Sequence, residues 1–272
     1  MLPIICSLDL YGIFFKKYKT TVMNKIQLSL IIILSLIIFS CKKVDLQIAS
    51  GNVIDAKGVA FTRYFSDKLG HPEQLILIVN DSRFNKKGEF VNVPAATFIF
   101  DIPKNAKEQT VFDHIEVDWN PYGHPPAGVY DLPHFDLHFY MVTKEEVLAT
   151  TDMAIMAIPV PSEYLPAHYV QGPSIPKMGT HWIDITSSEF PPIPGNSNFT
   201  QTFIYGSNDG KITFYESMIT KHFLETTTFF ERQIPQPEKF QKDGYFPTHM
   251  IIQKIGNLDQ IIFDKFIYRQ KS

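Results

Sequence analysis

Residues able to do chemistry gather in the segment Tyr130–Met141, which reads YDLPHFDLHFYM. If this segment is a β-strand, its side chains alternate between two faces. His134, Asp136 and His138 then share one face, and the other face is apolar. Imidazoles and carboxylates bind transition metals and transfer protons. The pattern predicts a metal or catalytic role for this face, with a solvated face of an edge strand as the alternative.

The spacing along the strand limits how these three residues could act together. A rise of about 3.3 Å per residue separates His134 from Asp136 by about 6.6 Å and from His138 by about 13 Å. Asp136 could bind a metal with one histidine, or a local bulge could bring both histidines together. In a third arrangement Asp136 accepts a hydrogen bond from a metal-binding imidazole and fixes its tautomer. The sequence leaves all three open.

Further ligands must come from elsewhere in the chain. His181 directly follows a glycine-containing turn, and Glu216 interrupts an apolar and aromatic run, where a carboxylate is costly unless paired. With His134 and His138 they form a three-histidine, one-carboxylate set, to which Asp136 can add. Such a nitrogen and oxygen set favours one divalent transition metal, Zn first, with Mn, Fe and Cu as alternatives. A structural role for His181 and an outward-facing Glu216 are the competing interpretations.

Other histidines are weaker candidates. His124 lies in a rigid proline-rich turn before the His-Asp-His strand, where it could cover the site or sit at the surface; with Trp182 it is expected to support the ligands rather than bind the metal. His114, Glu116 and Asp118 share a strand face that we interpret as solvated. Four histidines have no acidic partner on the same face: His71, His168, His222 and His249.

The N-terminal region predicts export. Ile26–Phe39 is an apolar run of 14 residues, too short for a bilayer core that needs about 20. It suits the apolar region of a signal peptide, and it ends at Cys41. The segment Ile38–Cys41 resembles the lipobox of a bacterial lipoprotein, in which the cysteine receives lipid, including palmitate. An ordinary signal peptide with a chance cysteine is the alternative.

This interpretation divides the chain into four parts. Residues 1–22 are an extension before a true start at Met23, residues 23–40 are the signal peptide, 41–50 a lipid-anchored linker and 51–272 a single domain. The predicted location is a bacterial membrane, on the periplasmic side, because no acidic surface-export tract follows the cysteine. Only one cysteine remains after cleavage, which excludes a disulfide and cysteine catalysis within the domain.

The fold class follows from short runs rich in Ile, Val, Phe, Tyr and Thr between prolines and turns. These are Gln74–Val79, Ala95–Asp101, Val111–Trp119, Val129–Val142, Phe199–Tyr205, Lys211–Ile219, Met250–Lys254 and Asp259–Tyr268. Turns are expected at 81–88 and, as a β-hairpin, at 207–210. A capping box at Thr143 predicts a helix over 144–150, and residues 220–225 predict one more turn.

We therefore predict one mainly β domain, an antiparallel sandwich or barrel-like fold with one or two short helices and long proline-rich loops. Residues 158–194 are expected to be irregular. The net charge of −3 disfavours a nucleic-acid-binding surface. Gly-rich phosphate loops, a helical H-E-x-x-H and a serine nucleophile elbow are absent from the sequence. Whether the protein is an enzyme is left open.

Four motifs resemble those of a family of bacterial exported proteins that carries a domain of unknown function. They cover Trp119–Pro125, Tyr130–Tyr140, Pro176–Trp182 and Phe203–Thr220. Ser217 departs from the family pattern, which has proline there. The resemblance implies that one set of residues acts together, but no reaction: His124, His134, Asp136, His138, His181 and Glu216.

Three hypotheses remain at this stage. The first is a metal-binding lipoprotein that uses the histidine and carboxylate set. The second is a non-catalytic scaffold, self-assembling subunit or ligand-binding module, in which the polar row is a buried hydrogen-bonded network; a homo-oligomer fits this case. The third is carbohydrate binding on an aromatic surface formed by Trp119, Tyr122, Tyr130 and Trp182.

Overall fold

The computed structural model describes residues 47–50, 60–80, 94–190 and 198–272. All of them belong to the compact unit Asp45–Ser272. The predicted signal peptide, the lipidation site Cys41 and the turn expected at 81–88 lie outside the described residues. Among the described residues, no helix has the length and apolar character needed to cross a membrane.

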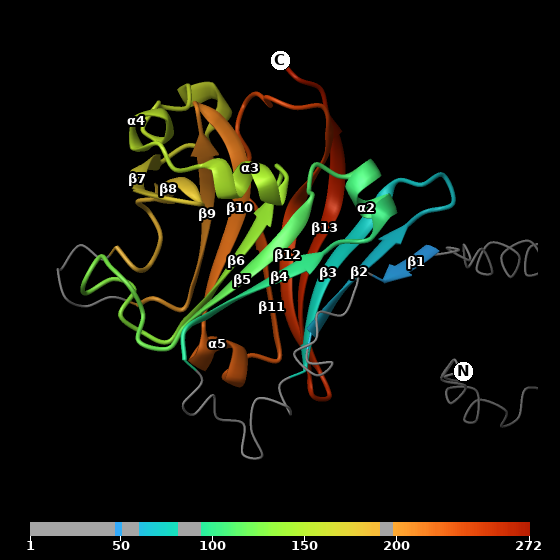
Figure 1. The fold of residues 1–272 in the computed structure, drawn as a ribbon. Coiled ribbons are helices and arrows are strands. Elements are labelled where there is room, and N and C mark those ends of the chain that lie inside the picture. The colour runs from blue at the N-terminus through green and yellow to red at the C-terminus, as the bar shows by residue number, and fades with distance from the viewer. Residues whose placement is uncertain (1–46, 51–59, 81–93, 191–197) are drawn as a thin grey trace, which may run out of the picture. The chain divides into compact units, whose positions relative to one another are not determined.

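Two antiparallel sheets form the fold (Figure 1). The first has six strands in the order β1-β2-β3-β13-β12-β11, namely β1 (Gln47–Ser50), β2 (Ala60–Ser66), β3 (Pro72–Asn80), β13 (Leu258–Arg269), β12 (Gly244–Ile255) and β11 (Phe229–Gln233). The second has seven strands in the order β4-β5-β6-β10-β9-β8-β7, namely β4 (Ala96–Asp101), β5 (His114–Asn120), β6 (His134–Tyr140), β10 (Lys211–Thr220), β9 (Gln201–Asn208), β8 (Gly179–Asp184) and β7 (Tyr169–Ile175).

The predicted mainly β, antiparallel class is confirmed. Both sheets are open in the part of the chain described, so the architecture is a sandwich rather than a barrel. One hydrophobic core joins the two sheets and includes Leu75, Phe139, Met250 and Phe263. The rings of Phe139 and Phe263, from opposite sheets, stack with their centroids 4.1 Å apart.

Alternation along β5 and β6 gives the second sheet two different faces. Leu137 and Phe139 of β6, with Ile115 and Val117 of β5, belong to the core between the sheets. Their neighbours in sequence, including His138, must point to the outer face. The apolar stripe of β6 therefore builds the core, and the polar row is left for the outer face of the second sheet.

Short helices connect the strands: α2 (Lys104–Gln109), α3 (Lys144–Ala149), α4 (Met153–Met156), α5 (Lys221–Thr226) and a 3-10 turn at Ser162–Tyr164. The helix predicted from the capping box is confirmed as α3. The Thr143 hydroxyl accepts from the Glu146 amide, and the Glu146 carboxylate accepts from the Thr143 amide. The turn predicted at 220–225 is confirmed as α5. The sequence did not predict α2 or α4.

Three predictions about elements require correction. Residues 158–190 are not irregular throughout, because β7 and β8 pair within them, and a register shift between Gln171 and Ser174 accommodates Pro173; residues 191–194 of this prediction lie outside the described residues. The linker expected at 41–50 is wrong for Gln47–Ser50, which is strand β1 paired with β2. The strand expected over 129–142 is shorter, since β6 begins only after Pro133.

The β-hairpin predicted at residues 207–210 is confirmed. Strands β9 and β10 pair across it, with Lys211 opposite Asn208. Asp209 and Gly210 have φ values of 53° and 66°, so both central residues adopt the left-handed conformation of a tight hairpin turn. On its other edge β10, which carries Glu216, pairs with β6.

Candidate metal centre

The outer face of the second sheet carries a buried row of histidines and carboxylates. In the pairing of β5, β6 and β10, His138 lies opposite Glu116 on one side and Glu216 on the other. His134, His138 and Glu216 are at most 2% exposed, although this face is not the sandwich core. Such buried ionisable groups need partners or a cation.

The first of two groups consists of His124, His134 and Asp136. The Nε2 atom of His134 lies 3.1 Å from Oδ1 of Asp136, and Nε2 of His124 lies 3.3 Å from its Oδ2. The two imidazole rings meet edge to face, with centroids 4.7 Å apart. One carboxylate thus lies between two imidazoles, and one ligand atom from each residue falls within 4.8 Å of the others.

The second group consists of His138, His181 and Glu216, from β6, β8 and β10. Nε2 of His138 is 3.7 Å from Oε1 of Glu216, and Nε2 of His181 is 3.6 Å from its Oε2. These gaps are longer than hydrogen bonds but leave room for an ion within reach of all three side chains. Phe214 packs edge to face against both rings, with centroids 5.1 and 5.3 Å away.

The other ring nitrogen of these histidines is fixed by an acceptor. The Nδ1 atom of His124 lies 2.7 Å from the backbone carbonyl oxygen of Pro125. In the same way, Nδ1 of His134 lies 2.6 Å from the carbonyl oxygen of Leu132, and Nδ1 of His181 lies 3.2 Å from that of Pro173. A carbonyl only accepts, so each Nδ1 carries the proton and donates. In a neutral imidazole the Nε2 atom that faces the carboxylate then has a free lone pair.

His138 and Asp136 are oriented by side chains instead. Nδ1 of His138 lies 3.3 Å from Oδ2 of Asp118, and the Thr97 hydroxyl donates to the other oxygen of that carboxylate. The Asn120 amide donates to Oδ2 of Asp136 over 2.8 Å. Partners that hold the far side of a ligand are typical of protein metal sites.

Several atoms at the centre of both groups are buried without a hydrogen bond from any described residue. They are Nε2 of His134, Oδ1 of Asp136, both ring nitrogens of His138 and Oε2 of Glu216. An imidazole lone pair beside a carboxylate oxygen is unfavourable unless a cation stands between them. That cation is either a proton or a metal ion.

The pKa values show how the groups hold protons when no metal is present. Burial disfavours the charged imidazole, yet the neighbouring carboxylates raise the pKa of His124 and of His138 to about 9. Burial and the positive charge of His138 lower the pKa of His181 to about 4. Burial raises the pKa of Glu216, whereas the adjacent imidazoles of His124 and His134 outweigh burial and lower the pKa of Asp136.

The structure divides the predicted four-ligand set. His134 and His138 belong to different groups, since β6 pairs regularly with both neighbours and has no bulge between them. His124, predicted only as a supporting residue, lies beside the carboxylate of the first group. Trp182 is on the opposite face of β8 from His181, in the core, where its indole donates to Ser207 over 2.8 Å.

Two interpretations of the remaining histidines are wrong. His114, Glu116 and Asp118 do not form a solvated face, as all three are at most 9% exposed, and His114 Nε2 lies 3.5 Å from Glu116. His71 and His249 do have acidic partners. Asp67 lies 2.9 Å from Nδ1 of His71, and Asp264 and Glu231 lie 2.8 Å and 3.5 Å from His249. The two partners of His249 lie on neighbouring strands, in a register that the sequence did not reveal.

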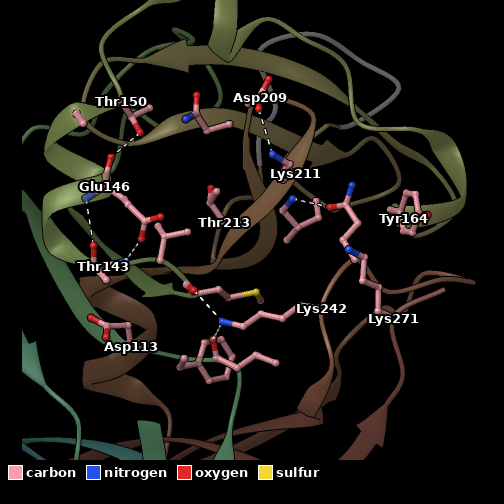
Figure 2. Close-up of a pocket in the computed structure, with 18 of the residues that line it drawn as sticks. Asp113, Thr143, Glu146, Thr150, Tyr164, Asp209, Lys211, Thr213, Lys242 and Lys271 are labelled. Atoms are coloured by element: carbon pink, nitrogen blue, oxygen red, sulfur yellow. Dashed lines mark hydrogen bonds and ion pairs between the residues drawn. The ribbon is translucent and has the colours of Figure 1, made fainter. Parts of the chain in front are cut away.

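Two of the cavities lined by described residues adjoin the second sheet and differ in character. One, of about 700 Å³, is lined by members of both histidine groups. The other, of about 880 Å³, is lined by four lysines and three acidic residues and contains no histidine (Figure 2). Most of its charges are used within the protein: Lys211 pairs with Asp209, and Lys242 donates to the carbonyls of Val111 and Met141. The candidate centre is therefore the first cavity.

Comparison with known proteins gives little on family. No family model and no solved structure matches the chain. Protein saf1 of Schizosaccharomyces pombe is similar, with 36% identity over 86 residues, or 32% of this chain. The matched stretch spans only a quarter of that protein. It assigns no family to the chain as a whole.

Proposed function

We propose that the protein is an exported, lipid-anchored metalloprotein that binds a divalent transition metal in each of its two histidine and carboxylate groups. The observation that carries this proposal is the orientation of the imidazoles. His134 and His181 each donate Nδ1–H to a backbone carbonyl and direct Nε2 at a buried carboxylate. This arrangement is typical of histidine ligands in metal sites.

The donor set favours a particular class of ion. Two imidazoles and one carboxylate bind Zn, Fe, Mn or Cu, and Zn is the first ion to test. Three protein ligands leave a coordination position for water. Bound zinc lowers the pKa of such a water to about 7, which supports hydrolysis, whereas a redox-active ion would support oxygen chemistry.

The N-terminal sequence supports export and lipid attachment. The apolar run Ile26–Phe39 and the lipobox-like segment ending at Cys41 carry this part of the proposal. Cys41→Ser should abolish palmitate incorporation and release the protein from the membrane fraction of a bacterial host. A variant that stays lipidated and membrane-bound would refute lipid attachment at Cys41.

Elemental analysis tests the metal assignment. The chain from residue 42 is purified without a His tag or chelator, as wild type and as His134→Ala, His181→Ala and His249→Ala. We expect two metal ions per wild-type chain and one in each of the first two variants, because each loses one group. His249→Ala is the matched control, since His249 is a buried histidine between two acids on the other sheet.

The competing function is a metal-free polar network that stiffens the sheet. It is favoured if no metal binds after incubation with Zn, Mn, Fe and Cu salts. His134→Ala would then lower the melting temperature by the same amount with and without added metal. The metal proposal instead requires that added metal ions raise the melting temperature of the wild type by more than that of His134→Ala.

A further inference from the structure

We infer that the cavity over the two groups receives a small molecule with an apolar body and a single anionic head that binds the metal. This inference rests on the proposed function, because the head needs a metal ion. It extends the proposed function by naming the chemical class of the ligand that binds the metal. The argument uses the cavity's walls, its rim, its polar groups and its size.

The walls of the cavity are apolar and its floor is polar. The floor is formed by His124, Asp136, His138, His181 and Glu216. The apolar lining comes from several strands and loops; it is mostly aliphatic, with Pro125, Pro173, Ile175 and Met218 among its members, and it includes the rings of Trp119 and Tyr130. Both candidate metal groups thus open into one chamber, and a molecule bound at the floor must pack its remainder on apolar side chains.

The apolar lining continues to the solvent. Ile175 is 38% exposed, and Pro125, Pro126 and Pro173 are exposed as well. Covering such side chains with an apolar ligand is favourable. Prolines have fixed φ, so these loops lose little conformational freedom when a ligand binds.

Two polar side chains of the walls are engaged within the protein, whereas the Tyr130 hydroxyl has no hydrogen-bond partner among the described residues. Thr97 donates to Asp118, and Asn120 donates to Asp136. Among the described residues that line this cavity there is no lysine or arginine. A sugar would therefore find few free partners along the walls, and an anionic head would have the metal as its binding partner. The other cavity differs in this respect, because its lining includes four lysines (Figure 2).

The volume of about 700 Å³ is within the range of roughly 300–1,000 Å³ of small-molecule sites. It fits a medium-chain aliphatic or aromatic acid and not a polymer. Alkyl hydroxamates of increasing length are suitable probes, because the head chelates zinc and the body can be varied one methylene at a time.

The experiment measures the affinity of the zinc-loaded chain from residue 42 for acetohydroxamate, hexanohydroxamate and octanohydroxamate by calorimetry. Affinity should rise about fourfold for each methylene that becomes buried, at about 0.8 kcal/mol per methylene. Hexanol, which has the body without the chelating head, should bind at least about tenfold more weakly than hexanohydroxamate. Zinc content is determined on the same samples.

A pair of surface variants tests the wall. Ile175→Asp puts a charge on the apolar rim and should weaken octanohydroxamate binding at least about tenfold with zinc content unchanged. Ile185→Asp is the control, because Ile185 is 51% exposed and lies outside the cavity lining. It should leave both quantities unchanged.

The outcomes separate this inference from the proposed function. Full zinc content with affinity independent of chain length would overturn the apolar site and leave the metal centre standing. The same holds if both aspartate variants weaken binding equally. A chain that binds no zinc would overturn the proposed function and this inference together.

Discussion

At the scale of single residues, the notable feature is that an acceptor group faces Nδ1 of each imidazole in both groups, and in three of them it accepts a hydrogen bond. Three of the four acceptors are backbone carbonyls of Pro125, Leu132 and Pro173, and Leu132 itself precedes a proline. Proline restricts its own φ and the backbone of the residue before it, which fixes where these carbonyls point. The proline-rich loops therefore act as rigid supports for the histidines.

The fourth group, the Asp118 carboxylate, lies 3.3 Å from Nδ1 of His138 and gives a prediction about this histidine. Asp118→Ala removes the group that faces Nδ1 of His138 and should reduce zinc affinity about 10–100-fold, the usual effect of losing such a partner. Asp113→Ala is the control, because Asp113 accepts from Nδ1 of His114, outside the two groups. Competition with a fluorescent zinc chelator measures both; equal losses in the two variants would contradict a specific role for Asp118.

At the scale of elements, close packing between β9 and β10 positions the second group. Gly206 lies opposite Phe214 across the strand pair and opposite His181 on β8. A Cβ atom on Gly206 would lie only 2.0 Å from the Phe214 ring. The missing side chain therefore makes the space in which Phe214 packs between the imidazoles of His138 and His181.

Gly206→Ala is accordingly expected to displace Phe214 and to destabilise the protein by ~1–3 kcal/mol, as overpacked sites do. It should also lower metal content at the second group, while His134 and the first group keep their ion. The double variant Gly206→Ala with Phe214→Leu provides space again and should recover metal content. Chemical denaturation and elemental analysis test this; loss of metal from both groups equally would argue against a local effect.

The strands also explain which parts of the fold and the site could be predicted from the sequence. Alternation predicted β6 and its two faces, because periodicity is local. The partners of β6 depend on register between distant segments, so the division into two groups was not predictable from spacing alone. Strand β7 was missed because Pro173 interrupts it, and His124 was undervalued because a loop residue has no periodicity. The acidic partners of His249 were not predictable for the same reason, because Glu231 and Asp264 lie on strands that pair with its own.

At the scale of the whole molecule, the candidate centre and the hydrophobic core occupy opposite faces of the second sheet. The core includes Leu137 and Phe139 between the sheets, whereas His134, Asp136 and His138 face outward from the same strand. Substituting a ligand therefore leaves the sandwich core intact. Because of this separation, changes in the melting temperature should reflect the protonation and the metal content of the groups on the outer face.

The metal-free protein should lose stability as pH rises from 6.5 to about 9. His124 and His138 have folded pKa values of about 9, so the folded chain keeps protons that the unfolded chain releases near 6.5. When the folded state binds more protons, stability falls with rising pH. Glu216, whose pKa burial raises, acts in the same direction, and the lowered pKa of His181 adds a penalty only below 6.5.

Bound zinc should reverse this trend, since metal ions compete with protons for the same ligands and bind more tightly as pH rises. The melting temperature with zinc minus that with chelator is therefore expected to widen between pH 6.5 and 9. Calorimetry at four pH values measures it, and the double variant His124→Ala with His138→Ala should flatten the metal-free curve. A metal-free melting temperature that is constant or rises over this range would mean that the two imidazoles are not held protonated by their carboxylates, and the electrostatic argument for a cation at both groups would fail with it.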